Sequence, residues 1–435
     1  MKIFRPYWRE SLGICIVVFG SPTIFFLRDT LKLGGGSVFS AAFLVLGMAL
    51  MISPSFLAKM YKPNTTLMKL GLSFLLLSLF YYFFYNPWAE NRNYDPVKEF
   101  AYLTIIFFFL FLLVNLPNQI SETLLMMIAL ATFVGSVALI VSLFLNPNYV
   151  LGQRATVYFG DGEEGGNPHV YAKNGFAQFV SALLILKNKK ILIKIFAVFS
   201  AFISIVVIII TQTRAILLSL ILVIIIFLYF NLTKKQVKET IKSVFTIRNV
   251  SIFFVLVFSV YYYLANYTFF FQILTNYTDR FTGTFTNALF TILGNKPESV
   301  TNVVEDPSAA QRVLNWTLFK NYWEGQPERL IFGLGFRYGY LDIPVLEAFL
   351  DCGILGFILF GGFNFIAAKE CYLAMRNKYS DLTTFLAYYY VSFFIGIFSA
   401  GRPFDTPYWL LFALLIRFMG IKYWKTEYLN NLKQS

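Results

Sequence analysis

Long apolar runs are the feature that most restricts what this chain can fold into. They recur along nearly the whole sequence, and each has the length, about 17–23 residues, that a helix needs to cross a hydrocarbon layer roughly 30 Å thick. Only 14% of the residues are charged and 57% are hydrophobic, whereas soluble chains carry about 25% charged residues. Backbone in lipid must satisfy its own hydrogen bonds, and helices do so. We therefore expect an all-α polytopic membrane protein.

The apolar runs predict about twelve membrane-spanning helices in three parts of the chain. Residues 1–266 hold the first nine spans, residues 267–343 form a large, partly helical outer loop, and residues 344–435 hold the last three spans and a tail. A second outer segment, 146–173, is rich in glycine. The expected spans are 11–27, 38–58, 70–87, 100–116, 123–145, 174–187, 191–211, 215–232, 250–266, 344–367, 382–400 and 407–421.

The distribution of positive charge predicts the orientation. Of the 36 lysine and arginine residues, 22 fall in the segments that an even number of spans places on the side of both termini. Short loops rich in lysine and arginine stay in the cytoplasm, so both termini are expected there. Because the net charge of +13 lies mostly in these short loops, it orients the protein and gives no reason to expect a nucleic-acid partner.

Arginine is concentrated on the outer side. Inside, lysine outnumbers arginine 17 to 5, whereas outside there are nine arginines and five lysines. The planar guanidinium group pairs with phosphate through two parallel hydrogen bonds, so these arginines favour an anionic ligand on the outer face. They are Arg28, Arg92, Arg154, Arg214, Arg280, Arg312, Arg329, Arg337 and Arg402.

Two of these arginines stand at positions suited to phosphate. Arg214 lies between two apolar spans that are joined by almost no linker, and it either binds a ligand or reaches the lipid headgroups as an interfacial side chain. Arg312 falls early in a predicted loop helix that starts after Asp306 and ends near Gly325. The N-terminus of a helix favours anions, and the alternative for Arg312 is a solvated helix face.

Asp342 is an isolated acid immediately before a predicted span that starts at Pro344. It is expected either to act as a general base at the membrane surface or to cap the helix. Glu347 and Asp351 follow inside the apolar run, where ionisable groups usually face a bundle interior or a cavity. His169 is the only histidine, and neither a metal nor a cofactor is expected.

Four short motifs, in this order, resemble those of the bacterial O-antigen polymerase and O-antigen ligase superfamily. The chain departs from the family pattern at His169, where asparagine is usual. Asp342 stands eleven residues before the last motif, at the place where ligases have a His-Asn pair and polymerases have aspartate, so the resemblance favours a Wzy-type polymerase. The motifs are Arg154 with Asn167-Pro168-His169, then Thr211-Gln212-Thr213-Arg214-Ala215, then Arg312 to Trp316 with Gly333 and Gly335, and Gly353 with Gly356.

The resemblance implies a GT-C-like glycosyltransferase of the bacterial inner membrane with a periplasmic active site. Its donor and acceptor would be oligosaccharides linked to undecaprenyl pyrophosphate, and its partners would include membrane lipids and a chain-length regulator protein. Arg214 and Arg312 would bind the donor pyrophosphate, and Asp342 would orient or deprotonate the acceptor hydroxyl. The further residues expected to contact substrate are Arg154, Lys173, Arg337, Tyr338, Arg402 and Glu347.

Three other functions stay open on the sequence alone. An O-antigen ligase would transfer finished glycan to lipid A–core, and a polymerase of capsule or another surface polysaccharide would carry out the same reaction on a different repeat unit. A flippase or transporter of lipid-linked sugars would show inverted repeats and charged groups at the midplane of several spans. The sequence contains no repeat of fixed period.

Overall fold

The structure is a computed structural model. It describes residues 7–54, 56–88, 95–150, 153–157, 167–231, 307–322, 324, 327–424 and 426, with isolated residues between 246 and 282. The chain divides into two compact units, the first comprising Met1–Asn148, Ala155–Leu220 and Asn315–Ser435, and the second comprising Tyr149–Arg154 and Ile221–Leu314.

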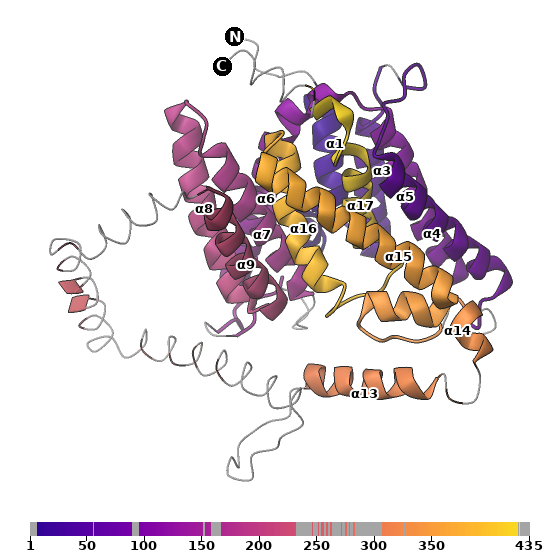
Figure 1. Cartoon of the computed structure of the whole chain (residues 1–435). Coiled ribbons are helices and arrows are strands. Elements are labelled where there is room, and N and C mark those ends of the chain that lie inside the picture. The colour runs from indigo at the N-terminus through magenta and orange to yellow at the C-terminus, as the bar shows by residue number, and fades with distance from the viewer. Residues whose placement is uncertain are drawn as a thin grey trace, which may run out of the picture. The chain divides into compact units, whose positions relative to one another are not determined.

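The described residues form helices and connecting loops. The helices are α1 (Trp8–Phe19), α2 (Ser21–Phe25), the π-helix η1 (Phe26–Thr30), α3 (Gly36–Leu50), α4 (Thr65–Phe84), α5 (Pro96–Val114), the 3₁₀ turn η2 (Asn118–Ile120), α6 (Ser121–Leu145), α7 (Pro168–Ile185), α8 (Ile191–Thr211), α9 (Arg214–Asn231), α13 (Pro307–Asn321), α14 (Glu328–Phe332), α15 (Pro344–Asn377), α16 (Asp381–Gly396) and α17 (Thr406–Phe418) (Figure 1).

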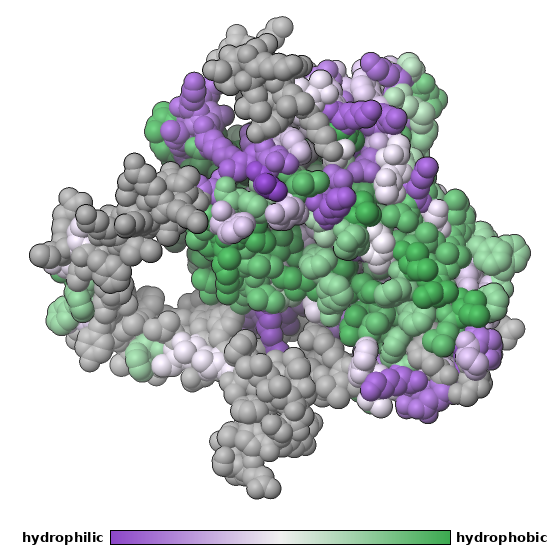
Figure 2. All heavy atoms as spheres, viewed as in Figure 1, coloured by the Kyte–Doolittle hydropathy of each residue, from purple (hydrophilic) through white to green (hydrophobic). Residues whose placement is uncertain are grey.

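Six helices in the described part of the chain are long and apolar enough to cross a membrane, which makes this an all-α membrane protein. They are α4, α5, α6 with η2, α8, α9 and α15. On the face drawn in Figure 2, a broad band of hydrophobic residues separates hydrophilic residues above it from those below it. Exposed apolar side chains cover α8 and α9. In the most apolar 18 residues of each helix, only 28% and 17% are buried, as expected for helices that face lipid.

The expected first span, 11–27, is not one straight helix. Helix α1 ends at Phe19, and the pair Trp8–Phe19 and Ser21–Thr30 is bent by 71°. Pro22 stands in the first turn of α2 and has no N–H to extend the ladder of α1. The expected ninth span, 250–266, lies almost entirely outside the described residues.

Helix α7 begins earlier than the predicted span 174–187. Asn167 caps it by accepting a hydrogen bond from the His169 N–H at 3.0 Å, and Pro168 occupies its first turn. Hydropathy does not register the polar first turn of α7. Because the helix begins at Pro168, Lys173 lies inside it. The predicted start of α15 at Pro344 and the predicted loop helix, observed as α13, are confirmed. The proposed cap Asp306 lies outside the described residues.

The loops of the first unit meet at two ends. At one end, residues 85–88, 333–343 and 397–405 contact one another, as in the hydrogen bonds from Phe336 N to Tyr85 O and from Gly401 N to Asp342 Oδ1. At the other end, residues 57–64 contact 114–116. Each group brings together segments that were expected on one side of the membrane. The expectation that the first end faces the periplasm rests on the distribution of lysine and arginine in the sequence.

Arg417 holds the second end together from inside α17. It is fully buried, and its guanidinium donates to Leu113 O at 3.1 Å, to Leu116 O at 2.6 Å and to Asn118 Oδ1 at 2.8 Å. The last carbonyls of a helix have no donor within the helix, and Arg417 supplies donors at the end of α5. Its charge also complements the negative C-terminal end of that helix.

Helix α15 is interrupted near its start, and the interruption positions the loop before it. Gly353 has φ 63° and ψ −160°, which is not helical. The loop after α14 lies against this break, with Leu334 N donating to Leu350 O at 2.8 Å and Gly335 N donating to Asp351 O at 3.0 Å. Two carbonyls released by the break thus regain donors. Figure 1 shows α14 and the first turns of α15 side by side.

Glycine is required at this contact because the two backbones touch. A Cβ on Gly353 would lie 2.0 Å from Ile331 O, and one on Gly333 would lie 2.4 Å from Asp351 O. Both residues also have positive φ, at 63° and 73°, which costs a residue with a side chain about 1–2 kcal/mol. The glycine pairs 333/335 and 353/356 therefore have a structural reason, although Gly335 meets Pro87 and Gly356 meets the backbone of Ala348.

Gly353→Ala should destabilise the protein, whereas Gly361→Ala should not. The first substitution forces the two backbones apart at a positive φ and should cost about 2–4 kcal/mol. A Cβ on Gly361, in the same helix, would have no described atom within 4 Å, and alanine there should stabilise by up to about 1 kcal/mol. Thermal unfolding in one detergent checks both, and equal midpoints for the two variants would contradict the contact between the loop and the helix break.

Candidate functional site

A cluster of charged side chains lies at the first end of the unit, around the loop 333–343. We call it the Arg402 cluster. It contains Glu99, Lys173, Arg337, Asp342, Glu347, Asp351, Arg402 and Asp405, drawn from α5, α7, α15 and the loops before α15 and α17.

Two buried carboxylates on α15 hold the loop in shape. Glu347 and Asp351 are one helical turn apart and have no exposed surface. Asp351 Oδ1 accepts from Tyr338 N at 3.0 Å, and Glu347 Oε2 accepts from Leu341 N at 3.2 Å. The loop backbone therefore wraps around these acids, and Glu347, expected to contact substrate, is placed as a support for the loop.

Arg402 joins the loop to Glu347 from the other side. Its Nε forms an ion pair with Glu347 Oε1, and its Nη2 donates to Arg337 O at 3.2 Å and to Gly339 O at 2.8 Å. Burial lowers the pKa of Arg402, but Glu347 and Asp351 raise it, and the net result lies above its ordinary value. Arg402 therefore stays charged and fixed.

Arg337 connects the loop to two further elements. Its guanidinium pairs with Glu99 in the first turn of α5 and, at 3.0 Å, with Asp405 Oδ1. Asp405 is the N-cap residue of α17, and its other oxygen accepts from Arg402 N at 2.9 Å. The Arg337 carbonyl accepts from Trp88 Nε1 at 2.7 Å. The expected contact residue Arg337 is thus held by two acids.

Lys173 reaches the cluster from the first turns of α7. Its ammonium lies 4.6 Å from the ring centroid of Phe393 on α16 and 5.2 Å from that of Tyr408 on α17. A cation over an aromatic face is attracted by the ring quadrupole. The negative charge of Asp405 also acts on this ammonium. Three helices are therefore joined around one lysine.

Asp342 stands at the exposed side of the cluster and is only partly buried. Its Oδ1 accepts from Gly401 N at 3.0 Å and from the Tyr340 hydroxyl at 2.9 Å. The N-cap residue of α15 is Ile343, so Asp342 lies one residue before the N-cap position. Burial and the neighbouring Asp342 raise the pKa of Tyr340, which keeps that phenol a proton donor to the carboxylate.

The other predicted site residues are carried by α9, α13, the segment 153–157 and the loop 333–343. Arg214 is the first residue of α9, exposed, and follows a turn in which Gln212 has φ 50°. Arg154, also exposed, and Arg312 belong to the second unit. The backbone of Arg312 lies in α13, but its side chain is outside the described residues. Tyr338 is present in the loop, where its backbone N–H bonds Asp351.

Nothing in the sequence singled out Glu99 and Asp405. Each lies in or beside the first turn of a helix whose first turn holds a proline, Pro96 in α5 and Pro407 in α17. An acid there is explained by the helix dipole alone, and only the fold brings both to Arg337. The signal in the sequence that could have found them is an acid close to a proline at the start of a helix expected on the outer side.

The cluster holds more acidic than basic groups. Among the described residues, five carboxyl groups stand against three cationic groups, and two of the acids, Glu347 and Asp351, are fully buried. Asp351 Oδ2 and Arg337 Nε are buried with no hydrogen-bond partner among those residues, so the cluster has polar capacity left for a bound group or for water. An acid-rich centre of this kind suits proton transfer from a hydroxyl.

No protein-family model matches the chain, and no curated protein is found similar to it.

Arg402→Gln alone should destabilise the loop more than the double variant Arg402→Gln/Glu347→Gln. Removing the arginine alone leaves Glu347 as a buried, unpaired charge, at a cost of about 3–5 kcal/mol. The double variant has no such charge and should recover much of that loss. Thermal unfolding and the rate of proteolysis at 333–343 check this. The control is Arg376→Gln, an exposed arginine in the last turn of α15. Additive losses would contradict the pairing.

Proposed function

We propose that this protein is a glycosyltransferase of the O-antigen polymerase kind, with a GT-C-like arrangement of about twelve spans in the bacterial inner membrane. It would transfer the growing glycan from undecaprenyl pyrophosphate to the non-reducing end of a new lipid-linked repeat unit at the periplasmic face. The single observation that supports this best is the Asp342 carboxylate, partly buried and fixed by Gly401 N and the Tyr340 hydroxyl beside a broken helix.

The proposed reaction needs a base and a stabilised leaving group. Asp342 takes the proton of the acceptor hydroxyl, whose oxygen attacks the anomeric carbon of the donor sugar. The bond from that carbon to the pyrophosphate oxygen breaks, and undecaprenyl pyrophosphate leaves with the electron pair. A general base must reach the hydroxyl at hydrogen-bond distance, and the partly exposed Asp342 carboxylate is held in one place where an acceptor could approach it.

Charge balance suggests a division of roles among the cationic residues. Arg337 and Arg402 are already paired with Glu99, Asp405 and Glu347, so they hold the base in place. The pyrophosphate would then be neutralised by Arg214 and Arg312, with Arg154 as a further contact. Preorganised cations at a developing negative charge are worth about 10²–10³-fold in rate.

A transporter of lipid-linked sugars is the second candidate, and one observation favours it. Buried polar side chains run along α7, where Asn174 Nδ2 donates to Ser136 Oγ at 3.0 Å and Gln178 Nε2 donates to Ser200 Oγ at 3.0 Å. Such groups line pathways in transporters. They also join helices in membranes as structural hydrogen bonds, and here they bond mainly to each other.

The proposed base and cations are tested by elongation of purified lipid-linked repeat units in proteoliposomes without an ion gradient. Asp342→Asn should lower the rate by about 10²–10⁴-fold, and Arg214→Ala and Arg312→Ala by about 10²–10³-fold each. The control is Arg376→Ala, an exposed arginine in the last turn of α15. Full activity in all three variants would refute the site, and no elongation by the unaltered protein would favour transport.

A deletion strain separates the related functions. A single repeat on the lipopolysaccharide core of that strain indicates a polymerase, and core without any repeat indicates a ligase. An unchanged ladder on the gel excludes both. In that case a polymerase of capsule or another surface polymer would be tested by the loss of that polymer.

A further inference from the structure

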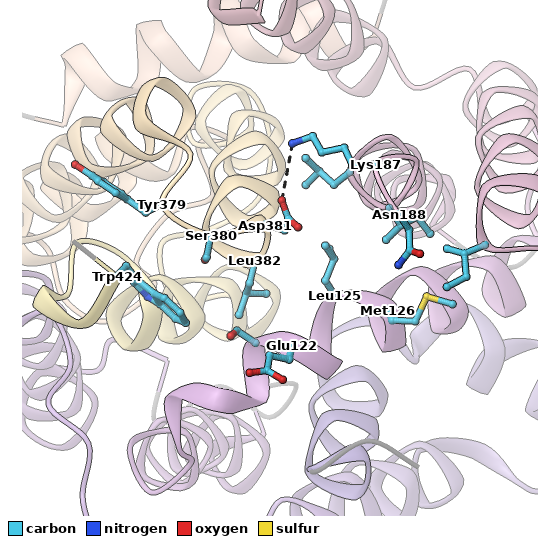
Figure 3. Close-up of a pocket in the computed structure, with 14 residues that line it drawn as sticks. Glu122, Leu125, Met126, Lys187, Asn188, Tyr379, Ser380, Asp381, Leu382 and Trp424 are labelled. Carbon is cyan, nitrogen blue, oxygen red and sulfur yellow. Dashed lines mark ion pairs between the residues drawn. The ribbon is translucent and has the colours of Figure 1, made fainter. Parts of the chain in front are cut away.

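A cavity of about 380 Å³ lies between the ends of four helices, remote in the fold from the Arg402 cluster. It is bounded by the start of α6, the end of α7, the start of α8 and the start of α16, with Trp424 closing one side (Figure 3). Clefts that hold small ligands start at about 300 Å³, so this one has room for a headgroup-sized molecule.

The cavity carries charges of both signs at its polar side. Glu122 and Asp381 provide two carboxylates and Lys187 one ammonium, a formal charge of −1 (1 − 2). Lys187 Nζ lies 3.8 Å from Asp381 Oδ1, and both side chains are more than half exposed. A well-formed charged hydrogen bond is about 2.7–2.9 Å long, so this pair is loose, and a ligand that inserts between its members loses little.

The floor of the cavity is apolar. Leu125 of α6 and Leu382 of α16 lie between Glu122 and the pair of Lys187 and Asp381 in Figure 3, and Met126 lies beside them. The Trp424 ring stands at the edge, with its Nε1 bonded to Phe418 O at 2.8 Å. The cavity therefore presents carboxylates for a cation, an ammonium for an anion, and an apolar surface for alkyl carbon.

The position of the cavity indicates the source of its ligand. Helices α6 and α8 are both candidate membrane spans, and they begin at this cavity. The ends of membrane-spanning helices lie at the depth of the lipid headgroups, where tryptophan is also enriched. A group with one ammonium, one phosphate and an attached acyl chain is what the bilayer offers at that depth.

We propose that this cavity binds the headgroup of an aminophospholipid, phosphatidylethanolamine in chemical class. Its primary ammonium lies between Glu122 and Asp381, its phosphate pairs with Lys187, and the first carbons of its chains rest on Leu125 and Met126. This site is independent of the proposed glycosyl transfer, because all of its residues lie outside the Arg402 cluster.

The test uses the full chain in nanodiscs of phosphatidylcholine alone or mixed with phosphatidylethanolamine or phosphatidylglycerol. Native mass spectrometry counts retained lipids, and thermal unfolding reports stabilisation. We expect one retained phosphatidylethanolamine per chain, and about tenfold weaker retention in Glu122→Gln/Asp381→Asn, since tenfold is the effect of one modest charged contact. The control is Glu328→Gln, an exposed acid in the first turn of α14.

A second variant separates binding from folding. Met126→Trp fills the cavity and leaves every charge in place, so it should also lose the lipid while its unfolding midpoint in phosphatidylcholine stays unchanged. Equal retention of phosphatidylglycerol, or full retention in both cavity variants, overturns the proposal. Stabilisation by soluble phosphoethanolamine equal to that by the lipid would also overturn it, because the ligand would then not be a membrane lipid.

Discussion

The contact between two stretches of backbone, at Gly333 and Gly353, is the interaction on which the candidate site depends. Backbone atoms approach so closely there that neither residue tolerates a Cβ. The contact ends the first turns of α15 at a fixed point and attaches the loop 333–343 to them. The charged residues of the Arg402 cluster that come from this loop and from the start of α15 are thereby held beside one another, and their hydrogen bonds and ion pairs add to this contact.

Burial explains why most charges of the cluster are paired. An ionised group removed from water is tolerated when it is paired and hydrogen-bonded. Glu347 has Arg402 and the Leu341 N–H, and Arg337 has Glu99 and Asp405. The pairs join α5, α15 and the start of α17 because each partner comes from a different element. Rigidity near Asp342 is thus a consequence of electrostatics as much as of packing.

The features that the sequence predicted are those that depend on local chemistry. Pro344 as the start of α15 and the presence of α13 agree with the structure. The bend after Phe19 and the break at Gly353 were missed, because hydropathy averages over a window and does not register one backbone angle.

The candidate site was predictable only in part. The fold gathers six of the predicted residues around one loop, although their contact with a substrate stays a prediction; they are Lys173, Arg337, Tyr338, Asp342, Glu347 and Arg402. Glu99 and Asp405 were missed because their significance comes from a partner far away in the chain.

Arg337 and Asp342 both adopt left-handed backbone conformations, with φ of 53° and 57°. Each costs about 1–2 kcal/mol relative to glycine at the same place. Glycine at either place would relieve the strain, but it would lose the pairing of Arg337 with Glu99 and Asp405 or the acceptor that Asp342 offers to Gly401 N. The strain at these two residues is therefore offset by contacts that only their side chains make.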